Sequence, residues 1–422
     1  MDSRIDLQQP VLDGGIRSIN FFNGRLLSAR DLTREQTAYR EADRRLGQAV
    51  GDGIAYGLEV SKTTGAGNDS PAVSVAAGLG INRRGQTLML AADTDVALVR
   101  STESNGGIDN FSDCLPLQTG AYVAGAGAYL LTLAPAQSSE GRATTNGMSP
   151  AAAACNTDTI VTAVQFRLIQ IDPPITDAEL QDRDHLRNLI AYKCFGTSET
   201  EGFLTNPFAA EVNRWGLLDD LRPDQLTDCE VPLAVLYWTQ ADGISFVDLW
   251  SVRRHLSRRS TNGNWNALLD DRLMAEGEAR LQQFTAQIDD LVTYKSAELM
   301  TIEAGDFFKY LPAAGVIPLG GVGSAVGFDQ LQFFKNSTTR PVVYMPGALL
   351  QDLLRQSFSF PPIDLNSPEV IWLYMVRENM EAFDQNPILG SIQPYLVFSS
   401  GQIPYRGVAR FDLADWSYSN FV

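Results

Sequence analysis

The chain has few histidines, lysines and cysteines for its length. Its 422 residues include 2 histidines, 4 cysteines and only five lysines. Two histidines leave little material for a His-based metal centre or a catalytic triad. The cysteines, Cys114, Cys155, Cys194 and Cys229, form no C-x-x-C pair, which argues against a zinc site. So sparse a set favours a reduced, cytosolic chain over a disulfide framework.

Long apolar runs are also absent. The densest run, residues 231–238, is only eight residues long and contains a proline, whereas a membrane-spanning helix needs about 20 apolar residues. The N-terminus lacks the basic start and apolar stretch of a signal peptide. We therefore expect no membrane span, no signal peptide, and synthesis and assembly in the cytoplasm.

The charge of the chain is strongly one-sided. Fifty acidic residues against 33 basic ones give a formal charge of −17, which repels phosphate backbones and makes nucleic acid an unexpected partner. Nearly every cation is an arginine, whose planar fork suits partly buried or interfacial ion pairs. Genomic base composition is an equally good explanation of that preference.

Length and composition indicate a folded, multidomain protein. Domains cluster near roughly 100–150 residues, so 422 residues correspond to about two to four packed units. Hydrophobic residues make up 44% of the chain and charged residues 20%, which excludes a wholly disordered or collagenous chain.

The first fifty residues predict a polar arm followed by an amphipathic helix. The arm covers residues 1–20, and an apolar hook, Phe-Phe-Asn-Gly-Arg-Leu-Leu, covers residues 21–27. Ser28 is a good N-cap, with Asp31 three residues later as its acidic partner. Apolar residues then recur at helical spacing until Gly51 and Gly53 end the segment.

The hook is the first candidate assembly site. Two adjacent phenylalanines before an amphipathic helix would leave apolar area uncovered unless another subunit or the following strands packed against it. The candidate interface residues here are Phe21, Phe22, Asn23 and Arg25.

Residues 21–260 predict a helix followed by a β-rich domain. Alternating apolar residues predict a strand over 54–60 and another over 73–77, a hairpin has Arg84-Gly85 at its tip, and a second hairpin pairs 231–239 with 244–252. A capping box at 176–179 predicts a helical insertion over about 176–196. Residues 101–120 and 135–158, rich in Ser, Thr, Gly and Asn, predict long surface loops.

Residues 261–300 predict a long helix with a narrow apolar stripe. Leu281, Phe284, Ile288 and Leu291 are spaced 3, 4 and 3 residues apart, as in a heptad pattern. Because only about two heptads are clean, the stripe could pack within one chain or form a short intermolecular coiled coil. Residues 301–422 predict a C-terminal β-rich domain, so the expected fold class is α+β, with mainly antiparallel β units.

One basic cluster stands out in the acidic chain. It contains Arg253, Arg254, His255, Arg258 and Arg259. Such a cluster could bind phosphate, but an inter-subunit ion-pair patch against an acidic neighbour fits the overall charge better. These four arginines and the stripe of the central helix complete the set of candidate interface residues.

Motifs of known catalytic chemistry are absent. The glycines of 320–327 have neither the dinucleotide nor the P-loop spacing, and no G-x-S-x-G, H-E-x-x-H or EF-hand motif occurs. His185 lies on a polar helical stretch with local carboxylates and lacks the partners of a base or ligand. We therefore expect no enzyme activity, no metal and no cofactor.

Several motifs occur in the order found in one known family. The hook with Ser28, Asp31, Leu32 and Glu35-Gln36, then Gly57-Leu58-Glu59-Val60 and Gly78-Leu79-Gly80-Ile81, resembles proteins encoded with phage-tail-like contractile injection systems. Residues 231–235 and 246–254 are similar to a later family segment. The resemblance covers residues 15–260 in patches, and Gly80 replaces the alanine usual there.

The resemblance implies a structural subunit of the baseplate and spike region, in a cage or fibre-like layer, of a particle that is membrane-docked or released by lysis. It implies other particle subunits as partners, a homo-oligomer, and a trimer as the favoured order because such tails have three- or six-fold symmetry. The alternatives are a receptor- or carbohydrate-binding tail protein and, last, a glycan hydrolase.

Overall fold

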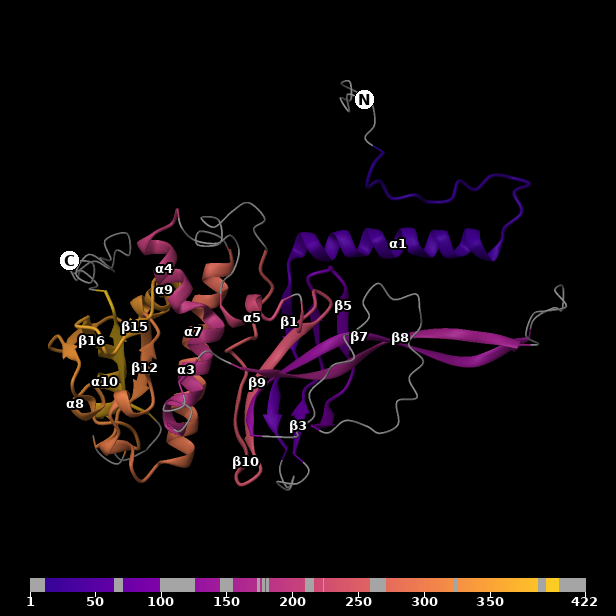
Figure 1. Cartoon of the computed structure of the whole chain (residues 1–422). Helices are drawn as coiled ribbons and strands as arrows, with labels where there is room; N and C mark the ends of the chain where they lie inside the picture. The colour runs from indigo at the N-terminus through magenta and orange to yellow at the C-terminus, as the bar shows by residue number, and fades with distance from the viewer. Residues whose placement is uncertain are drawn as a thin grey trace, which may run out of the picture.

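The computed structural model shows two β-rich units joined by helices. It describes residues 12–63, 71–98, 126–144, 155–172, 175–176, 179, 182–208, 216–222, 224–258, 271–321, 325–385 and 392–401. Helices α3 (Arg183–Phe195) and α7 (Asp271–Tyr294) lie between the N-terminal sheets and the C-terminal sheet (Figure 1). The expected α+β multidomain class, with an early helix and a long central helix, is confirmed.

Helix α1 (Ala29–Val50) begins and ends where the sequence predicts. The Ser28 hydroxyl accepts a hydrogen bond from the Asp31 backbone N–H at 3.2 Å, and the Asp31 carboxylate accepts one from the Ser28 N–H at 3.1 Å. These two bonds form the predicted capping box. The helix ends at Gly51, whose φ of 114° favours glycine.

Two small sheets follow α1. The first has the order β1-β4-β5 and the second β2-β3-β6; their bounds are β1 Gly53–Gly57, β2 Val60–Lys62, β3 Ala72–Val75, β4 Gly78–Ile81, β5 Thr87–Leu90 and β6 Thr94–Ala97. The predicted single strand over 54–60 is wrong, because Gly57 and Leu58 have φ values of 63° and 60° and turn the chain from one sheet into the other. Leu58 is fully buried, and this burial offsets the cost of a left-handed leucine.

The largest N-terminal sheet has the order β10-β9-β7-β8. The predicted hairpin is confirmed as β9 (Val231–Thr239) and β10 (Gly243–Asp248). Strands β7 (Gly127–Thr144) and β8 (Cys155–Ile171) pair along their whole lengths and extend beyond the sheet as a two-stranded ribbon (Figure 1).

The ribbon overturns one expectation. Of the predicted loop over 135–158, residues 135–144 and 155–158 are strand. A ribbon with both faces in water needs no apolar alternation, so its Ser, Thr and Gly composition hid the pairing. The predicted loop over 101–120 lies outside the described residues.

Helix α3 covers one face of the large sheet. The capping box at Thr176 and Glu179 forms, with the Thr176 N–H donating to the Glu179 carboxylate at 2.8 Å, but α3 begins at Arg183 with Asp182 as its cap. Short helices α4 (Thr197–Thr205) and α5 (Leu217–Asp220) follow. Ile190 of α3 packs with Leu130 and Val235 of the sheet in one buried cluster.

The C-terminal unit is built on a five-stranded sheet of order β12-β17-β16-β13, with β14 also paired to β16, and a two-stranded pair β11-β15. Its strands are β11 Tyr310–Leu311, β12 Ala314–Pro318, β13 Thr338–Thr339, β14 Val343–Met345, β15 Ile363–Asp364, β16 Val370–Val376 and β17 Tyr395–Ser399. Its helices are η1 Leu299–Thr301, η2 Ala304–Asp306, α8 Gln330–Phe333, α9 Ala348–Ser357 and α10 Arg377–Gln385.

The apolar stripe of α7 belongs to this unit. Phe284, Ile288 and Leu291 are buried in one cluster with Phe308 and Phe398, and the rings of Phe284 and Phe398 meet edge to face at 5.3 Å. Leu281 is only partly buried. Of the two arrangements left open by the sequence, the structure has the intrachain one, so these side chains are core residues rather than a seam between copies.

A buried ion network fixes α7 against the N-terminal unit. Arg187 of α3 donates to Asp248 of β10 at 2.7 Å and also binds Asp290 of α7. Gln283 of α7 donates to the same Asp248 carboxylate at 3.2 Å. Burial opposes the charge on Arg187, but the two carboxylates outweigh it and raise the pKa of the guanidinium.

The cysteines differ from the expectation of a fully reduced chain. The sparse cysteines predicted that no disulfide forms, but Cys229 is disulfide-bonded. Cys194 is a buried free thiol, and burial raises its pKa to about 12.

Within the described ranges, the helices are all too short or too polar to cross a bilayer.

A first prediction tests the burial of the α7 stripe. Ile288→Asp places a carboxylate in the C-terminal core, and we expect it to lower the free energy of unfolding by more than about 3 kcal/mol. Limited proteolysis should then cut within the C-terminal unit. Thr285→Asp adds the same charge at an exposed position of α7 and should leave the protein resistant. A folded, protease-resistant but monomeric Ile288→Asp protein would contradict the core assignment.

Candidate functional site: an assembly interface

The hook of residues 21–27 is held in place by local polar contacts. A turn at Asn23-Gly24 brings the Arg25 N–H to the Phe22 carbonyl at 3.2 Å, and Gly24 has a φ of 89°. The Arg25 guanidinium donates to the Asn20 carbonyl at 2.8 Å and to Asp31 at 2.9 Å. Hydrogen bonds from Ser28, followed by Arg25, lower the pKa of the Asp31 carboxyl to about 2. The Arg25 guanidinium is therefore paired within the chain, and it holds the hook against the start of α1.

The apolar side chains of the hook have no such cover. Phe21, Phe22, Leu26 and Leu27 are between 52% and 92% exposed. A contiguous group of this kind is typical of an interaction surface rather than of a solvated loop. Two of the predicted interface residues, Phe21 and Phe22, are thus placed on the surface, while Arg25 has a local structural role.

Helix α1 continues the same surface. Leu32, Tyr39 and Leu46, each seven residues from the next, are 51%, 67% and 66% exposed, and Val50 follows four residues later. Of the 22 residues of α1 only Ala38 and Gly47 are buried. Most helical stability in proteins comes from packing an apolar face. A helix that leaves its apolar face in water therefore indicates a missing partner. Sequence reasoning predicted the helix but did not name this stripe as an interface.

One end of α1 is anchored to the body by two glycines. A Cβ atom at Gly47 would lie 2.2 Å from the carbonyl oxygen of Gly85, and one at Gly85 would lie 2.0 Å from the carbonyl oxygen of Arg44. Gly85, at the tip of the β4-β5 hairpin, has a φ of 78°. The backbones touch here because neither residue has a side chain.

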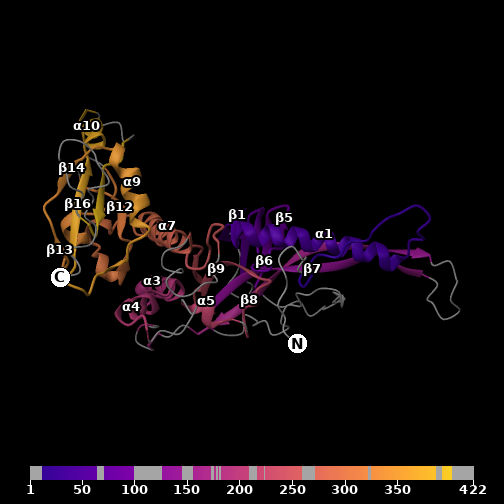
Figure 2. The same ribbon diagram turned by 90° about the horizontal axis from the view of Figure 1, so that it is seen from above.

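From this anchor α1 and the β7-β8 ribbon extend in the same direction, away from the C-terminal unit (Figures 1 and 2). The opposite end of α1 carries the hook and is tied to the arm, since the Ile19 N–H donates to Glu35 at 2.9 Å. The apolar surface therefore lies on a projecting part of the molecule.

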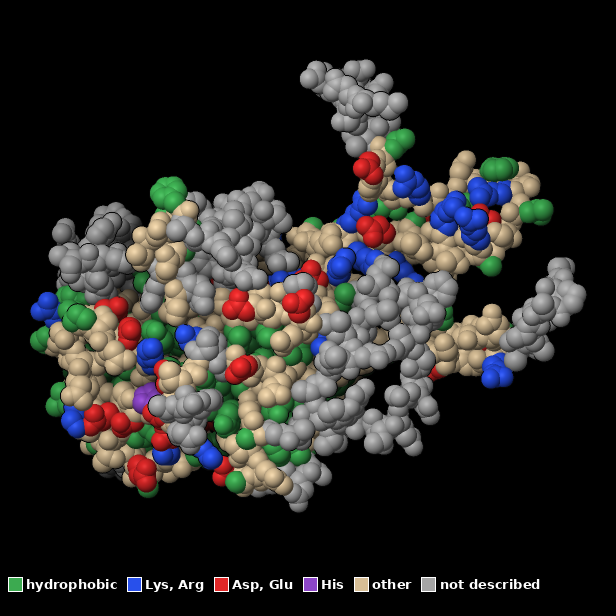
Figure 3. Space-filling model, in the orientation of Figure 1, with side chains coloured by type: hydrophobic (Ala, Val, Ile, Leu, Met, Phe, Trp, Pro, Cys, Tyr) green, Lys and Arg blue, Asp and Glu red, His purple; other side chains and the backbone are tan. Residues whose placement is uncertain are grey.

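The arm and α1 differ in charge from the rest of the chain. Residues 12–50 contain seven arginines and five carboxylates, in a chain with a formal charge of −17. Blue arginine side chains accordingly gather over α1, with green apolar groups near the hook (Figure 3). An acidic rim around an apolar face would complement this surface.

The predicted basic cluster is not one surface patch. Arg253 is buried and donates to the Gly57 carbonyl at 2.7 Å, and Arg254 donates to main-chain carbonyls beside it. Arg258 is exposed, and Arg259 lies outside the described residues. Arg253 and Arg254 therefore use their guanidinium groups within the fold, and the inter-subunit role of the cluster stays a prediction.

Both histidines have partners in the fold. His185 lies with Nδ1 2.6 Å from the Asp182 carboxylate and with Nε2 against the Gly305 carbonyl, so it connects the start of α3 to the C-terminal unit. His255 Nε2 is 3.6 Å from Glu278, and its ring packs on Trp250. Sequence reasoning did not foresee the contact between His185 and Gly305, which is distant in the chain.

Comparisons with known proteins add little. No protein-family model matches the chain, and no curated protein matches it. A solved structure, the crystal structure of TssK, aligns with 45% of this chain and 50% of its own at 9% identity and a TM-score of 0.21. The match thus spans about half the length of TssK, and a likeness at this score carries no argument about fold or function.

A second prediction tests the glycine anchor. Gly47→Val puts a branched side chain where a Cβ already meets the Gly85 carbonyl, so we expect the C-terminal end of α1 to detach. The free energy of local unfolding at this end of α1 should fall by about 1.4 kcal/mol, so trypsin should cleave at Arg44 and Arg45 about tenfold faster. Gly202→Ala is the control, since a Cβ there meets nothing within 4 Å. Equal cleavage rates for the two variants would show that α1 is held elsewhere.

Proposed function

We propose that the chain is a non-enzymatic structural subunit of a contractile, phage-tail-like injection particle, and that it joins its neighbours through the hook and α1. The proposal rests on one observation: a series of exposed large apolar side chains, from Phe21 to Val50, that no described part of the chain covers. We infer a neighbouring subunit whose apolar face is flanked by carboxylates.

The motifs that carry the family resemblance support this inference in different ways. Gly57-Leu58 has a role in the fold, since it turns the chain between two sheets with Leu58 in the core. The apolar residues of the hook have no comparable role, because their side chains are exposed to water. An assembly contact would account for the part of the resemblance that the fold leaves unexplained.

The position in the baseplate and spike region, in a cage or fibre-like layer, is proposed on the resemblance alone, as is a homo-oligomer with three copies. Since the α7 stripe is used in the core, contacts between copies are proposed at the projecting surface instead. Catalysis is not part of the proposal. A hydrolytic activity that is lost in His185→Ala or His255→Ala would contradict it.

A third prediction tests the surface directly. Phe22→Asp and Tyr39→Asp each place a charge on the exposed stripe, and we expect at least about tenfold less incorporation into particles, as burying an apolar side chain is worth about 1.5–3 kcal/mol. Far-UV circular dichroism and the melting temperature should stay unchanged, because both residues are exposed.

Thr37→Asp is the matched control for this experiment. It adds the same charge to an exposed position of α1, two residues before Tyr39 and five after Leu32 and therefore on a different face of the helix from the stripe, and it should assemble normally. Incorporation can be measured by co-expression with the other particle genes, followed by sedimentation and mass spectrometry. Normal incorporation of both stripe variants would refute the proposed interface.

A further inference from the structure

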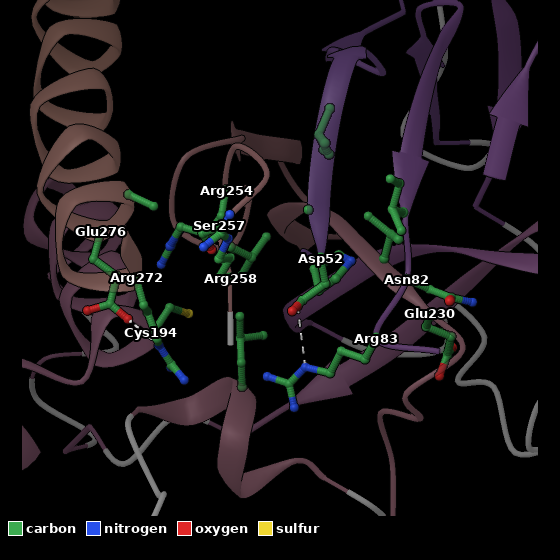
Figure 4. A pocket seen from close by; sticks show the side chains of 18 of the residues that line it. Asp52, Asn82, Arg83, Cys194, Glu230, Arg254, Ser257, Arg258, Arg272 and Glu276 are labelled. Atoms are coloured by element: carbon green, nitrogen blue, oxygen red, sulfur yellow. Dashed lines mark hydrogen bonds and ion pairs between the residues drawn. The ribbon is translucent and has the colours of Figure 1, made fainter. Parts of the chain in front are cut away.

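A small cavity lies where the N-terminal unit meets α7. Its volume is about 80 Å³, and its walls come from the start of β1, the tip of the β4-β5 hairpin, the start of β9, residues 252–258 and the first turns of α7. A water needs roughly 10–15 Å³ on this measure, so the cavity holds a few waters or one small ion. Figure 4 shows the polar side chains that surround it.

The cavity is lined by more arginines than carboxylates. The five arginines are Arg83, Arg222, Arg254, Arg258 and Arg272, and the three carboxylates are Asp52, Glu230 and Glu276. Each carboxylate already has a cationic partner: Asp52 is 3.5 Å from Arg83, Glu230 is 2.8 Å from Arg167, and Glu276 is 3.0 Å from Arg272. Asp219 and Asp228, outside the lining, pair with Arg83, Arg272 and Arg222.

Two of the arginines are left without a carboxylate at ion-pair distance among the described residues. Arg254 donates only to main-chain carbonyls, at 2.6 Å to Trp250 and 3.1 Å to Ser251, and lies 4.8 Å from the centre of the Phe195 ring. Arg258 stands at the exposed edge of the cavity. Figure 4 shows both on one loop, between Arg272 on one side and Arg83 on the other.

The surroundings of Arg254 and Arg222 destabilise the charged form of each guanidinium group. Burial lowers the pKa of the Arg254 guanidinium to about 10, and the negative charge of Glu276 offsets this only in part. Burial and then the charge of Arg83 likewise lower the pKa of Arg222 to about 10, and the Nε of Arg222 is buried without a hydrogen-bond partner. An anion in the cavity would relieve both conditions.

We propose that this cavity binds one small tetrahedral oxyanion, with inorganic phosphate as the simplest example, between Arg254, Arg258 and Arg222. Guanidinium groups bind such anions through paired, charge-assisted hydrogen bonds. All three ligands belong to the N-terminal unit, two on the loop 252–258 and one after α5, and Arg272 and Glu276 of α7 line the other side of the cavity, so the bound ion stabilises the part of the N-terminal unit that faces α7. This site is separate from the hook and α1, so its failure would leave the proposed assembly interface intact.

The experiment is a thermal titration of the full chain in phosphate-free buffer. We expect the melting temperature to rise with added sodium phosphate and to exceed the rise in sodium chloride at equal ionic strength. Phosphoserine is a second probe: a free ion is indicated if only inorganic phosphate stabilises, and a phosphate group on a larger molecule if both do. Equal effects of phosphate and chloride would overturn the proposal.

Two variants and a control locate the effect. Arg254→Gln should abolish the phosphate-specific rise, and Arg258→Gln, an exposed position that is safe for folding, should weaken apparent affinity by about tenfold, the loss of one charge-assisted contact. Arg40→Gln removes an exposed arginine of α1 and should respond like the unaltered chain. If Arg258→Gln and Arg40→Gln behave identically, the anion does not bind in this cavity.

Discussion

The arrangement of the two units depends on one buried cation, Arg187. Its guanidinium joins Asp248 of the N-terminal sheet to Asp290 of α7, and Gln283 of α7 meets the same Asp248. Breaking a buried pair by removing one partner typically costs about 3–5 kcal/mol. The direction of α7 follows from these contacts, and with it the place of the C-terminal unit and the walls of the arginine cavity.

Arginine has two distinct uses in this chain. Inside, Arg187 and Arg254 each make hydrogen bonds from two nitrogens of one planar group, which a lysine ammonium could not reproduce in the same geometry. Outside, the arginines of α1 flank an apolar stripe, and their positive charge contrasts with the net negative charge of the whole chain. The first use holds the fold together, and the second suits recognition of an acidic neighbour.

Local patterns predicted local structure well. The cap at Ser28, the hairpin at Gly85 and the β9-β10 hairpin follow from turn residues and apolar alternation, which depend only on neighbours in sequence. The failures have non-local causes. Leu58 adopts a left-handed conformation because the core covers it, and the ribbon of β7 and β8 pairs without an apolar face.

The candidate sites show the same division. The hook is a local sequence motif and was predicted as an assembly site. The cavity is lined by residues as far apart in sequence as Asp52 and Glu276, so local patterns could not predict it. For α7, spacing alone could not decide between a core and a seam.

The contact of Gly47 with Gly85 has a consequence for how the surface of α1 can change. Because backbone atoms meet at this point and Leu32, Tyr39 and Leu46 are exposed, the side chains of the stripe contribute little to the placement of the helix. The stripe and its charged flanks can therefore be rewritten for a different neighbour while the helix stays where it is. Binding specificity could therefore be changed by substituting exposed residues of α1, without moving the helix and without changing the core.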